Sequence, residues 1–492
     1  MATRKIPNHP NTKQNNLKGK QNSMATATIP HLPVLVIHHV LHFLPTKHAI
    51  RMSSLCKQWA GLWSSVPVLD LEEEDEPHEK FINFVDRCLE ILEKYEQLDK
   101  FRLRMTLISD EDEEKVLECL RFAVERRVKE LDIGLSFIQQ FLVVGFLSPL
   151  LNAKSITSLN LENVIIDADW DEPIISLPSL KTLSLKTVRF KPASFISSLI
   201  SCCPCIQHLS VTSSSSSDYD ITSTDYCTIF MQTLLDAKSL TSLNLEFVVI
   251  ANDLEKGPPI GRLPCLKTMS LTNVNMYYDG TLAQLISSSP SLEHLSVSIS
   301  SPRYYNYSLP SSSLKSFEVR IFDSKGVFNS DVVRVIGAKS LESCTLVLES
   351  PKQIKRILFD RCENLKHLSI RAPQLPNFTL QLHGCKNLVN ASLDIPKLYF
   401  TRISSNVEWR HFYSLANYLG KFQSFENISL YVDDAEALIF PKNMRKFYDP
   451  PLRTVNTLTV FISSPRGAQD SKLRHSLFWL GPESLSIIYS DL

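Results

Sequence analysis

The residue types best suited to chemistry are the cysteines of the run CCPC at 202–205, followed by His208. Thiolate and imidazole groups are the usual zinc ligands, and a structural zinc site needs four of them in spaced pairs. The crowded CCPC run is not spaced as two ligand pairs, and only His208 lies nearby. Cys203, Cys362 and Cys385 instead share one position of a sequence repeat, three residues before a repeat leucine or isoleucine. We therefore predict small packing residues at these positions and no metal site.

Histidines form two further patterns. His38 and His42 are four residues apart, but no acid or cysteine is placed to complete a metal site with them. His208, His294 and His367 recur at one repeat position without a paired nucleophile. The chain has no Gly-rich phosphate loop and no GxSxG motif, and only 13 glycines in all. The sequence thus predicts no catalytic residues and no cofactor, and it favours a protein that binds other proteins.

Residues 32–63 indicate how such binding is arranged. The Leu-Pro pairs at 32–33 and 44–45 bracket apolar residues at the i, i+3, i+4, i+7 spacing of an amphipathic helix: Ile37, Val40, Leu41 and Leu44. A proline is tolerated in the first turn of a helix and disfavours helix at the residue before it. Thr46 can cap a second helix, and Leu55, Trp59, Leu62, Trp63 and Val66 predict a third. Three short helices bury little surface alone, so we expect their surplus apolar residues to face another protein.

This segment resembles an F-box of the plant type, with a pattern close to LPxxxLxxILxFLPxKxAxRxSxLxKxW. The matching residues are Leu32, Pro33, Ile37, Val40, Leu41, Phe43, Leu44, Pro45, Lys47, Ala49, Arg51, Ser53, Leu55, Lys57 and Trp59. The family usually has acidic residues just after the first proline, where this chain has Val34 and Leu35. The resemblance implies docking on a Skp-type adaptor, and through it on the cullin and RING subunits of a ubiquitin ligase. We expect the adaptor contacts at Leu32, Pro33, Ile37, Leu41, Leu44 and Pro45, with Trp59 and Trp63 chiefly holding the helices together.

The rest of the chain repeats an apolar pattern φ-x-x-φ-x-φ. It begins at Leu98, Val128, Ile156, Leu180, Ile206, Leu240, Leu266, Leu292, Leu314, Leu341, Leu365, Leu388, Phe425 and Val455. Most intervals match the period of leucine-rich repeats, in which one short strand per repeat stacks into a solenoid. AKSITSLNLENVII at 153–166 recurs as AKSLTSLNLEFVVI at 237–250, which indicates a duplicated block of repeats. We therefore predict an α/β fold, a three-helix F-box followed by a leucine-rich-repeat solenoid with strands lining a concave face.

The turn after each strand departs from the usual repeat. Leucine-rich repeats commonly place asparagine there, whereas this chain has Val164, Val188, Val248 and Val274. Such repeats, together with the closing segment SLFWLGPESLSII at 476–488, resemble the plant F-box/FBD/leucine-rich-repeat group. The predicted organisation is a disordered tail at 1–28, an F-box at 29–75, and a linker helix with the solenoid at 76–492. Either Met1 or Met24 could be the true start.

Composition narrows the function. Lys+Arg and Asp+Glu both number 52, so the chain has no net charge that would favour nucleic acid or an anionic membrane. No apolar run approaches the roughly 20 residues that span a bilayer. Eleven cysteines, an odd number, are expected to stay reduced in the nucleus or cytoplasm. The acidic runs EEEDE at 72–76 and DEDEE at 110–114 are interpreted as solvated charge, and the Ser-rich inserts at 212–226 and 300–313 as exposed loops.

In a solenoid strand, the residues that flank and separate the two inward leucines face the concave side. This face is mostly Ser, Thr and Asn, and its most anchor-like residues are His367, Arg371, Tyr431 and Phe461. The sequence therefore predicts a substrate-recognition subunit of a ubiquitin ligase whose repeats hold an unknown target protein. One alternative is a ligase-independent scaffold. A second is a small-molecule receptor, which would need a basic pocket lined by aromatic residues, and the sequence shows no such cluster.

Overall fold

The structure is a computed structural model in which the chain forms two compact units, the first ending at Val66 and the second beginning at Pro67. It describes residues 32–54, 57–94, 96–137, 150, 153–167, 176–213, 227–252, 260–276, 280–299, 306–321, 332–349, 354–372, 378–395, 405–464 and 470–489. The predicted tail at 1–28 and residues 214–226 and 300–305 of the two Ser-rich inserts lie outside these ranges. The rest of the second insert is not the predicted exposed loop, because Asn306–Ser308 form a strand and Tyr307 and Leu309 are 3% and 0% exposed. Among the described residues, no helix is long and apolar enough to cross a membrane.

The first unit begins with two helices that prolines start. They are α1 (Val34–His42) and α2 (Thr46–Met52), with Pro33 and Pro45 at their N-caps. The Pro33 carbonyl accepts hydrogen bonds from the backbone N–H groups of Val36 and Ile37, at 2.9 and 3.2 Å. Pro45 does the same for His48 and Ala49, at 2.9 and 3.0 Å. Both predicted helices are therefore confirmed, but the predicted cap is wrong: Pro45 is the N-cap of α2, and Thr46 is its first helical residue and makes no side-chain cap.

The predicted third helix is wrong in type and length. The described residues 57–61 form turns, and only a 3-10 helix, η1 (Leu62–Ser65), follows. Gly61 has a φ of 74°, a left-handed conformation that interrupts an α-helix. The apolar spacing of Trp59, Leu62 and Val66 therefore comes from a turn and one tight helical turn.

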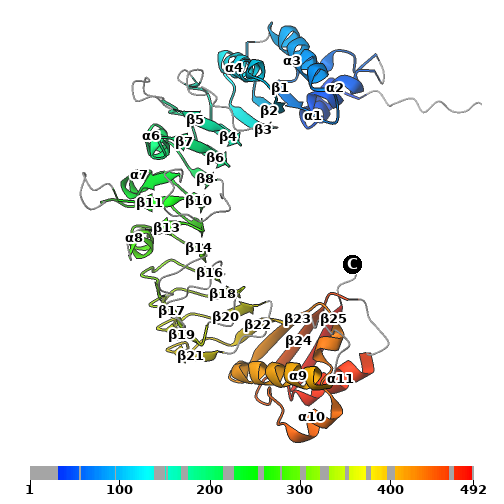
Figure 1. Ribbon diagram of the computed structural model, residues 1–492, viewed down its shortest axis with the longest axis vertical. Helices are drawn as coiled ribbons and strands as arrows, with labels where there is room; N and C mark the ends of the chain where they lie inside the picture. Colours follow the sequence, from blue (N-terminus) through cyan, green and yellow to red (C-terminus); the bar gives the residue numbers. More distant parts are fainter. Residues whose placement is uncertain are drawn as a thin grey trace, which may run out of the picture. The chain divides into compact units, whose positions relative to one another are not determined.

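The second unit is built on one 16-stranded parallel sheet, whose strands follow the chain order (Figure 1). They are β1 (Val68–Glu72), β2 (Lys100–Leu107), β3 (Glu130–Phe137), β4 (Ser158–Glu162), β6 (Thr182–Lys186), β8 (His208–Thr212), β10 (Ser242–Glu246), β12 (Thr268–Thr272), β14 (His294–Ile299), β16 (Ser316–Ile321), β18 (Ser343–Leu348), β20 (His367–Arg371), β22 (Asn390–Ile395), β23 (Asn427–Val432), β24 (Thr457–Ile462) and β25 (Ser484–Tyr489). Fourteen of them, β2 to β24, begin two residues after the predicted start of each repeat, so the predicted solenoid is confirmed.

Three smaller parallel sheets and a set of helices complete this unit. The sheets are β5 (Ile165–Asp167) with β7 (Arg189–Lys191); β9 (Thr228–Phe230), β11 (Val249–Ala251) and β13 (Asn275–Met276); and β15 (Asn306–Ser308), β17 (Val332–Ile336), β19 (Arg356–Asp360) and β21 (Thr379–His383). The helices are α3 (His78–Leu92), α4 (Asp110–Glu125), α6 (Phe195–Ser201), α7 (Met231–Asp236), α8 (Thr281–Ser287), α9 (Ser405–Leu419), α10 (Lys442–Phe447) and α11 (Asp470–Trp479), with 3-10 turns η2 (Gly420–Phe422) and η3 (Ala435–Leu438). In Figure 1, α6, α7, α8 and the small sheets lie on one side of the long sheet, which leaves the other face to the polar strand residues.

Strand β1 changes the expected domain boundary. The F-box was predicted to extend to residue 75, yet β1 pairs with β2 from Val68↔Lys100 to Glu72↔Arg104 and so belongs to the second unit. Leu69 and Leu71 are fully buried. The chain after Val66 is therefore the first strand of the solenoid, since the apolar edge of β2 needs a neighbour to cover it.

The valines after the strands pack as expected, and a backbone ladder replaces the asparagine ladder. Val164, Val188 and Val248 are at most 2% exposed, while Val274 is partly exposed. The residues just before them have a φ of 52–56° and donate their N–H to the strand end of the next repeat, at 2.6–3.0 Å: Asn163 to Lys186, Thr187 to Thr212, Phe247 to Thr272 and Asn273 to Ser298. Backbone groups can pair in this way whatever the side chain, which explains why asparagine is not required.

The acidic runs are not simply solvated. Asp112 is 6% exposed, and its Oδ2 accepts hydrogen bonds from the N–H groups of Ile108 and Ser109 at 2.8 and 2.9 Å, so it caps α4. His78 lies between Asp112 Oδ1, at 2.8 Å, and Glu73 Oε1, at 2.9 Å. Glu73 also accepts from the N–H of Thr106 at 2.6 Å. This cluster joins β1, β2, α3 and α4 at the start of the solenoid.

The His78 cluster predicts a pH-dependent stability. Burial opposes the charged imidazole, but the hydrogen bonds that His78 donates to Asp112 and Glu73 outweigh burial and raise the pKa of His78 above its ordinary value. A raised folded-state pKa means that the stabilisation is complete below the ordinary pKa of about 6.5 and is lost as the pH rises through the folded value. We expect His78→Gln to lower the free energy of unfolding by about 1 kcal/mol near pH 6 and by less at pH 9.

Urea titrations followed by circular dichroism at the two pH values measure this difference. The exposed histidine of β8 gives the control variant His208→Gln, which should match the native chain at both. If His78→Gln lowers the free energy of unfolding by the same amount at pH 6 and pH 9, the predicted contribution of the charged imidazole is contradicted.

Candidate protein-interaction sites

Helix α1 exposes a set of apolar side chains that nothing in its own unit covers. The exposed fractions are 81% for Leu35, 70% for Phe43, 50% for Val34, 43% for Val36 and 37% for Val40. The opposite side of the helix carries Ile37 and Leu41, at 0% and 2% exposed, which lie in the interior of the unit. An amphipathic helix that is apolar on its outer side as well is typical of a surface that binds a partner.

The predicted adaptor residues divide into two groups. Pro33 is exposed, and Leu32, Leu44, Pro45 and Trp63 are partly exposed. Ile37, Leu41 and Trp59 are buried, so their side chains hold the unit together. Their expected part in adaptor contact stays a prediction.

The sequence pattern did not single out Leu35 and Phe43 as contact residues. In the sequence, Leu35 was noted only because the family usually has an acidic residue there, and Phe43 only because it matches the motif. Leu35 is the most exposed apolar residue of α1, and Phe43, the C-cap of the helix, is almost as exposed. The signal was available, because both fall on the helix side opposite Ile37 and Leu41.

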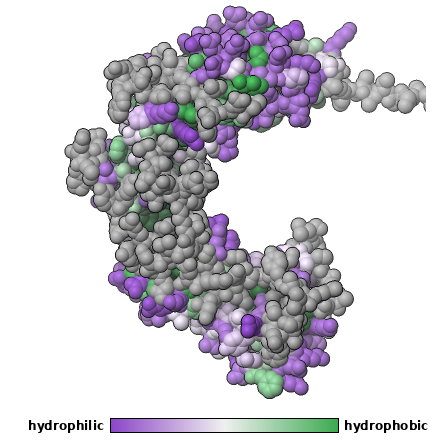
Figure 2. Space-filling view, viewed as in Figure 1, coloured by the Kyte–Doolittle hydropathy of each residue, from purple (hydrophilic) through white to green (hydrophobic). Residues whose placement is uncertain are grey.

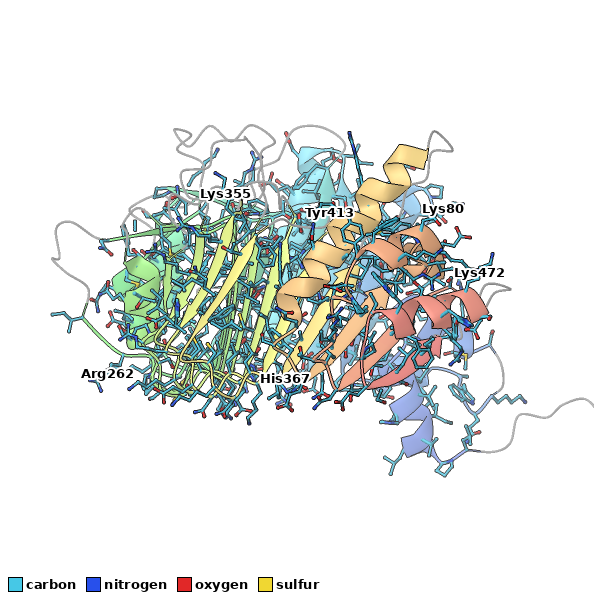
Figure 3. The ribbon with its side chains drawn as sticks, turned by 90° about the horizontal axis from the view of Figure 1, so that it is seen from below. Lys80, Arg262, Lys355, His367, Tyr413 and Lys472 are labelled. Carbon is cyan, nitrogen blue, oxygen red and sulfur yellow. The ribbon has the colours of Figure 1, made fainter. Side chains whose placement is uncertain are left out.

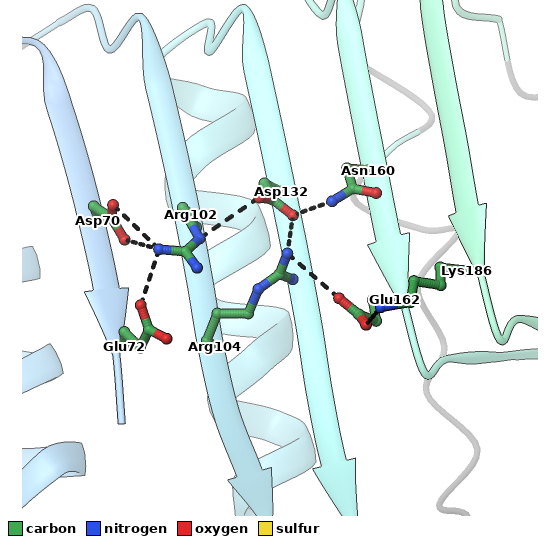
Figure 4. A network of polar contacts seen from close by, with 8 residues as sticks. All are labelled: Asp70, Glu72, Arg102, Arg104, Asp132, Asn160, Glu162 and Lys186. Atoms are coloured by element: carbon green, nitrogen blue, oxygen red, sulfur yellow. Dashed lines mark hydrogen bonds and ion pairs between the residues drawn. The ribbon is translucent and has the colours of Figure 1, made fainter. Parts of the chain in front are cut away.

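The polar face of the solenoid starts with a network of charges across β1, β2, β3, β4 and β6 (Figure 4). Arg102 Nη1 contacts Asp70 at 3.2 Å and Glu72 at 2.9 Å. Arg104 Nη2 contacts Asp132 at 2.8 Å and Glu162 at 3.6 Å. Asn160 donates to Asp132 at 2.6 Å, and Lys186 pairs with Glu162. Aligned parallel strands place these side chains beside one another, so opposite charges on neighbouring strands compensate each other.

Gly134 gives Arg104 its place in this network. A Cβ on Gly134 would come within 1.9 Å of Arg104 Nη1, so the guanidinium lies directly over the glycine backbone. That Nη1 is buried and has no hydrogen-bond partner among the described residues. The network thus depends on a missing side chain at the fifth position of β3.

The predicted target-binding residues come together only in part. Tyr431 and Phe461 are register partners on β23 and β24, and their rings stack at 4.7 Å with 6° between planes. Arg371 lies near them, since its Nε is 3.8 Å from Asp394 Oδ2 and Asp394 is the register partner of Tyr431. His367 begins β20, four residues from Arg371, and Figure 3 shows it at the edge where the strands start. We therefore separate His367 from the other three residues.

A shallow groove of about 650 Å³ follows this same edge of the sheet. Its lining includes Lys267, Glu293, Lys315, Glu342 and Lys366. Lys315 pairs with Glu293 at 2.8 Å and Lys366 with Glu342 at 3.3 Å. Charges that are already paired along an open edge make a weak candidate for a ligand site.

The described residues offer little for catalysis. They contain no group of three or more His, Cys, Asp or Glu side chains placed to hold a metal ion. Cys203 is 1% exposed, and burial raises the pKa of its thiol to about 12, as it does for Cys227. A buried thiol with a raised pKa is an inert packing group, as predicted for Cys203.

A second exposed apolar residue lies on α10, the helix that ends at Phe447. Phe447 is 80% exposed, and Figure 2 shows a hydrophobic spot over this helix.

Comparison with known protein families agrees with this organisation. The F-box domain model matches residues 29–71, a leucine-rich-repeat model matches 179–204, and the model described as FBD-associated F-box protein At5g56370, LRR repeats, matches 222–398. An F-box therefore precedes leucine-rich repeats on one chain. These matches confirm the resemblance to plant F-box/leucine-rich-repeat proteins that the sequence indicated, a family that is generally one of non-catalytic interaction proteins.

Several Arabidopsis thaliana proteins are similar to the chain. The chain is 30% identical to the putative FBD-associated F-box protein At5g22720 over 247 residues, 49% of each chain. It is 30% identical to the F-box/FBD/LRR-repeat protein At2g26030 over 44% of this chain and 47% of that one. It is 33% identical to the F-box/LRR-repeat protein At4g14103 over 37% and 48%. The matched segments thus span about half the length of these relatives.

The contact between Arg104 and Gly134 predicts a coupled pair of mutations. Gly134→Ala should displace the guanidinium from Asp132 and lower the free energy of unfolding by about 1 kcal/mol. In the background of Arg104→Ala, where the displaced group is absent, the same glycine substitution should have little effect. A double-mutant cycle by urea titration measures the coupling, and strictly additive effects contradict it.

Proposed function

We propose that the chain is the substrate-recognition subunit of an SCF-type cullin-RING ubiquitin ligase. F-box domains generally bind Skp-type adaptors. The observation that carries the proposal is the exposed apolar surface of α1, with Leu35 at 81% and Phe43 at 70% exposure. Large apolar side chains at this exposure on a small unit are favourable only when a partner covers them.

The solenoid supports the second half of the proposal. Its long sheet presents one open face from β1 to β25 that is polar over most of its length, a surface of the extended kind that repeat proteins use to bind other proteins. A target held there would be brought close to the ubiquitin-charged enzyme. Transfer to a target lysine would then gain from a high effective concentration rather than from a catalytic residue of this chain.

A reducing compartment, the nucleus or the cytoplasm, is part of the proposal. Ten described cysteines are free, and Cys88, Cys119, Cys203, Cys227, Cys344 and Cys362 are buried. Buried free thiols are common in proteins that fold where disulfides are reduced.

Adaptor binding tests the first half. We expect Phe43→Asp to reduce recovery of the chain with a purified Skp-type adaptor at least about tenfold, because it places a charge in an apolar contact. The fold should survive, since Phe43 is 70% exposed. Phe447→Asp, at a similarly exposed residue of α10, is the matched control and should leave recovery unchanged. The paired substitution of Leu32 and Pro33 by alanine should act like Phe43→Asp.

The buried residues of α1 should behave differently. Ile37→Ala removes a fully buried side chain and is expected to destabilise the first unit by about 2–4 kcal/mol. It should therefore weaken adaptor recovery through unfolding, which circular dichroism and limited proteolysis would show. A native chain that binds no adaptor favours the rival reading, a ligase-independent leucine-rich-repeat scaffold.

A further inference from the structure

The fifth positions of the last strands form a row unlike the rest of the polar face. Asp394 on β22, Tyr431 on β23, Phe461 on β24 and Ile488 on β25 are successive register partners. The corresponding residues in the middle of the sheet are small or charged: Thr212, Glu246, Thr272 and Ser298. Tyr431 is 43% exposed and Ile488 44%, so an aromatic and aliphatic strip is open to solvent at this end of the solenoid.

Two carboxylates beside this strip have too little positive charge around them. Arg371 Nε is 3.8 Å from Asp394 Oδ2, beyond hydrogen-bond distance. Burial raises the pKa of Asp394 despite the attraction of Arg371, and the charge of the exposed Asp433 raises it further. A second cation placed here would relieve the repulsion between the two acids.

The charged network at the other end of the sheet shows the contrast. There Arg102 and Arg104 reach carboxylates at 2.8–3.2 Å, and Lys186 adds a third cation. Those charges are compensated within the chain. Among the ion pairs of the described residues, Asp394 has only Arg371, at 3.8 Å, and Asp433 has none.

We propose that this row binds a segment of the target protein that presents an arginine or lysine next to an aliphatic side chain. The proposal rests on the proposed function, in which the repeats hold a target. The cation would lie over the ring of Tyr431 and near Asp394 and Asp433, a favourable cation–π and ionic arrangement. The aliphatic side chain would cover Phe461 and Ile488, the kind of central apolar contact on which interfaces depend.

A displayed library of random 12-residue peptides, selected on the full chain, tests this preference. We expect the recovered peptides to be enriched about fivefold or more in Lys or Arg next to Leu, Ile, Val or Met. Recovery of the enriched peptides should fall about tenfold on Tyr431→Ala and on Asp394→Asn. Ser429→Ala, on the same strand, and Thr272→Ala, at the same position in mid-sheet, are matched controls and should behave as the native chain.

Arg371→Gln should change the recovery of basic peptides in the opposite direction. It removes the cation that competes for Asp394, so recovery of basic peptides should rise on this variant. Enrichment of acidic peptides, or a loss of binding on Arg371→Gln, would show an anionic ligand and overturn the inference. Enrichment that Tyr431→Ala leaves unchanged, or no enrichment of basic peptides, overturns it as well.

Two further outcomes are separable. Light scattering that shows a dimer of the native chain, lost on Tyr431→Ala, would assign the row to a second copy of the chain and overturn the inference. Adaptor recovery, measured on the same preparation, decides the proposed function independently. If the chain binds the adaptor but shows no preference for basic peptides, only the inference is refuted. If basic peptides are enriched but the adaptor does not bind, the peptide-binding role of the row is supported and the ligase role is refuted.

Discussion

Each inner strand of the long sheet depends on two neighbouring strands to help cover its apolar side. In β4, Leu159 and Leu161 are each 1% exposed, with β3 and β6 beside them. At the two ends of the sheet, where a neighbouring strand is missing, other residues must cover the apolar side chains from solvent. At the first end, β1 and the His78 cluster cover them. At the last end, β25 has no strand beyond it among the described residues, and its residues alternate between exposed and partly exposed.

The same parallel register governs the polar face. Residues at one position of successive strands are neighbours about 5 Å apart, so their charges cannot be chosen independently. Near β2, positive and negative side chains alternate across the strands: Arg102 and Arg104 lie among carboxylates, and Gly134 leaves room for Arg104. In the middle the problem is avoided with Ser, Thr and Asn. Near β23 an aromatic pair stands beside acids that are only loosely paired, which is why recognition is assigned there.

The F-box unit follows a different physical rule. Its interior has room for few side chains, and Ile37, Leu41, Ala49 and Trp59 occupy it. The remaining apolar residues of α1 stay outside. A single helix thus stabilises its unit with one side and offers the other to a partner, so mutations on the two sides are expected to affect different properties.

The sequence by itself determined the architecture, because both of its signals are local. Prolines start α1 and α2 at their predicted positions, and the period of leucines set the start of fourteen strands. It failed at one local feature and at one contact between distant residues. The left-handed backbone of Gly61 broke the expected third helix, and pairing with β2 moved the domain boundary to Val66.

The candidate sites depended on tertiary structure to a greater extent. The motif marked α1 as a contact element, but only packing showed that Ile37 and Leu41 face inward and Leu35 and Phe43 outward. Tyr431 and Phe461 could be picked by residue type, yet their stacking, and the acids beside them, arise from strands 30 or more residues apart in sequence. Residue type and spacing fix what a segment can form, whereas which side chains are buried, and which charges meet, is decided by the neighbours that the fold brings together.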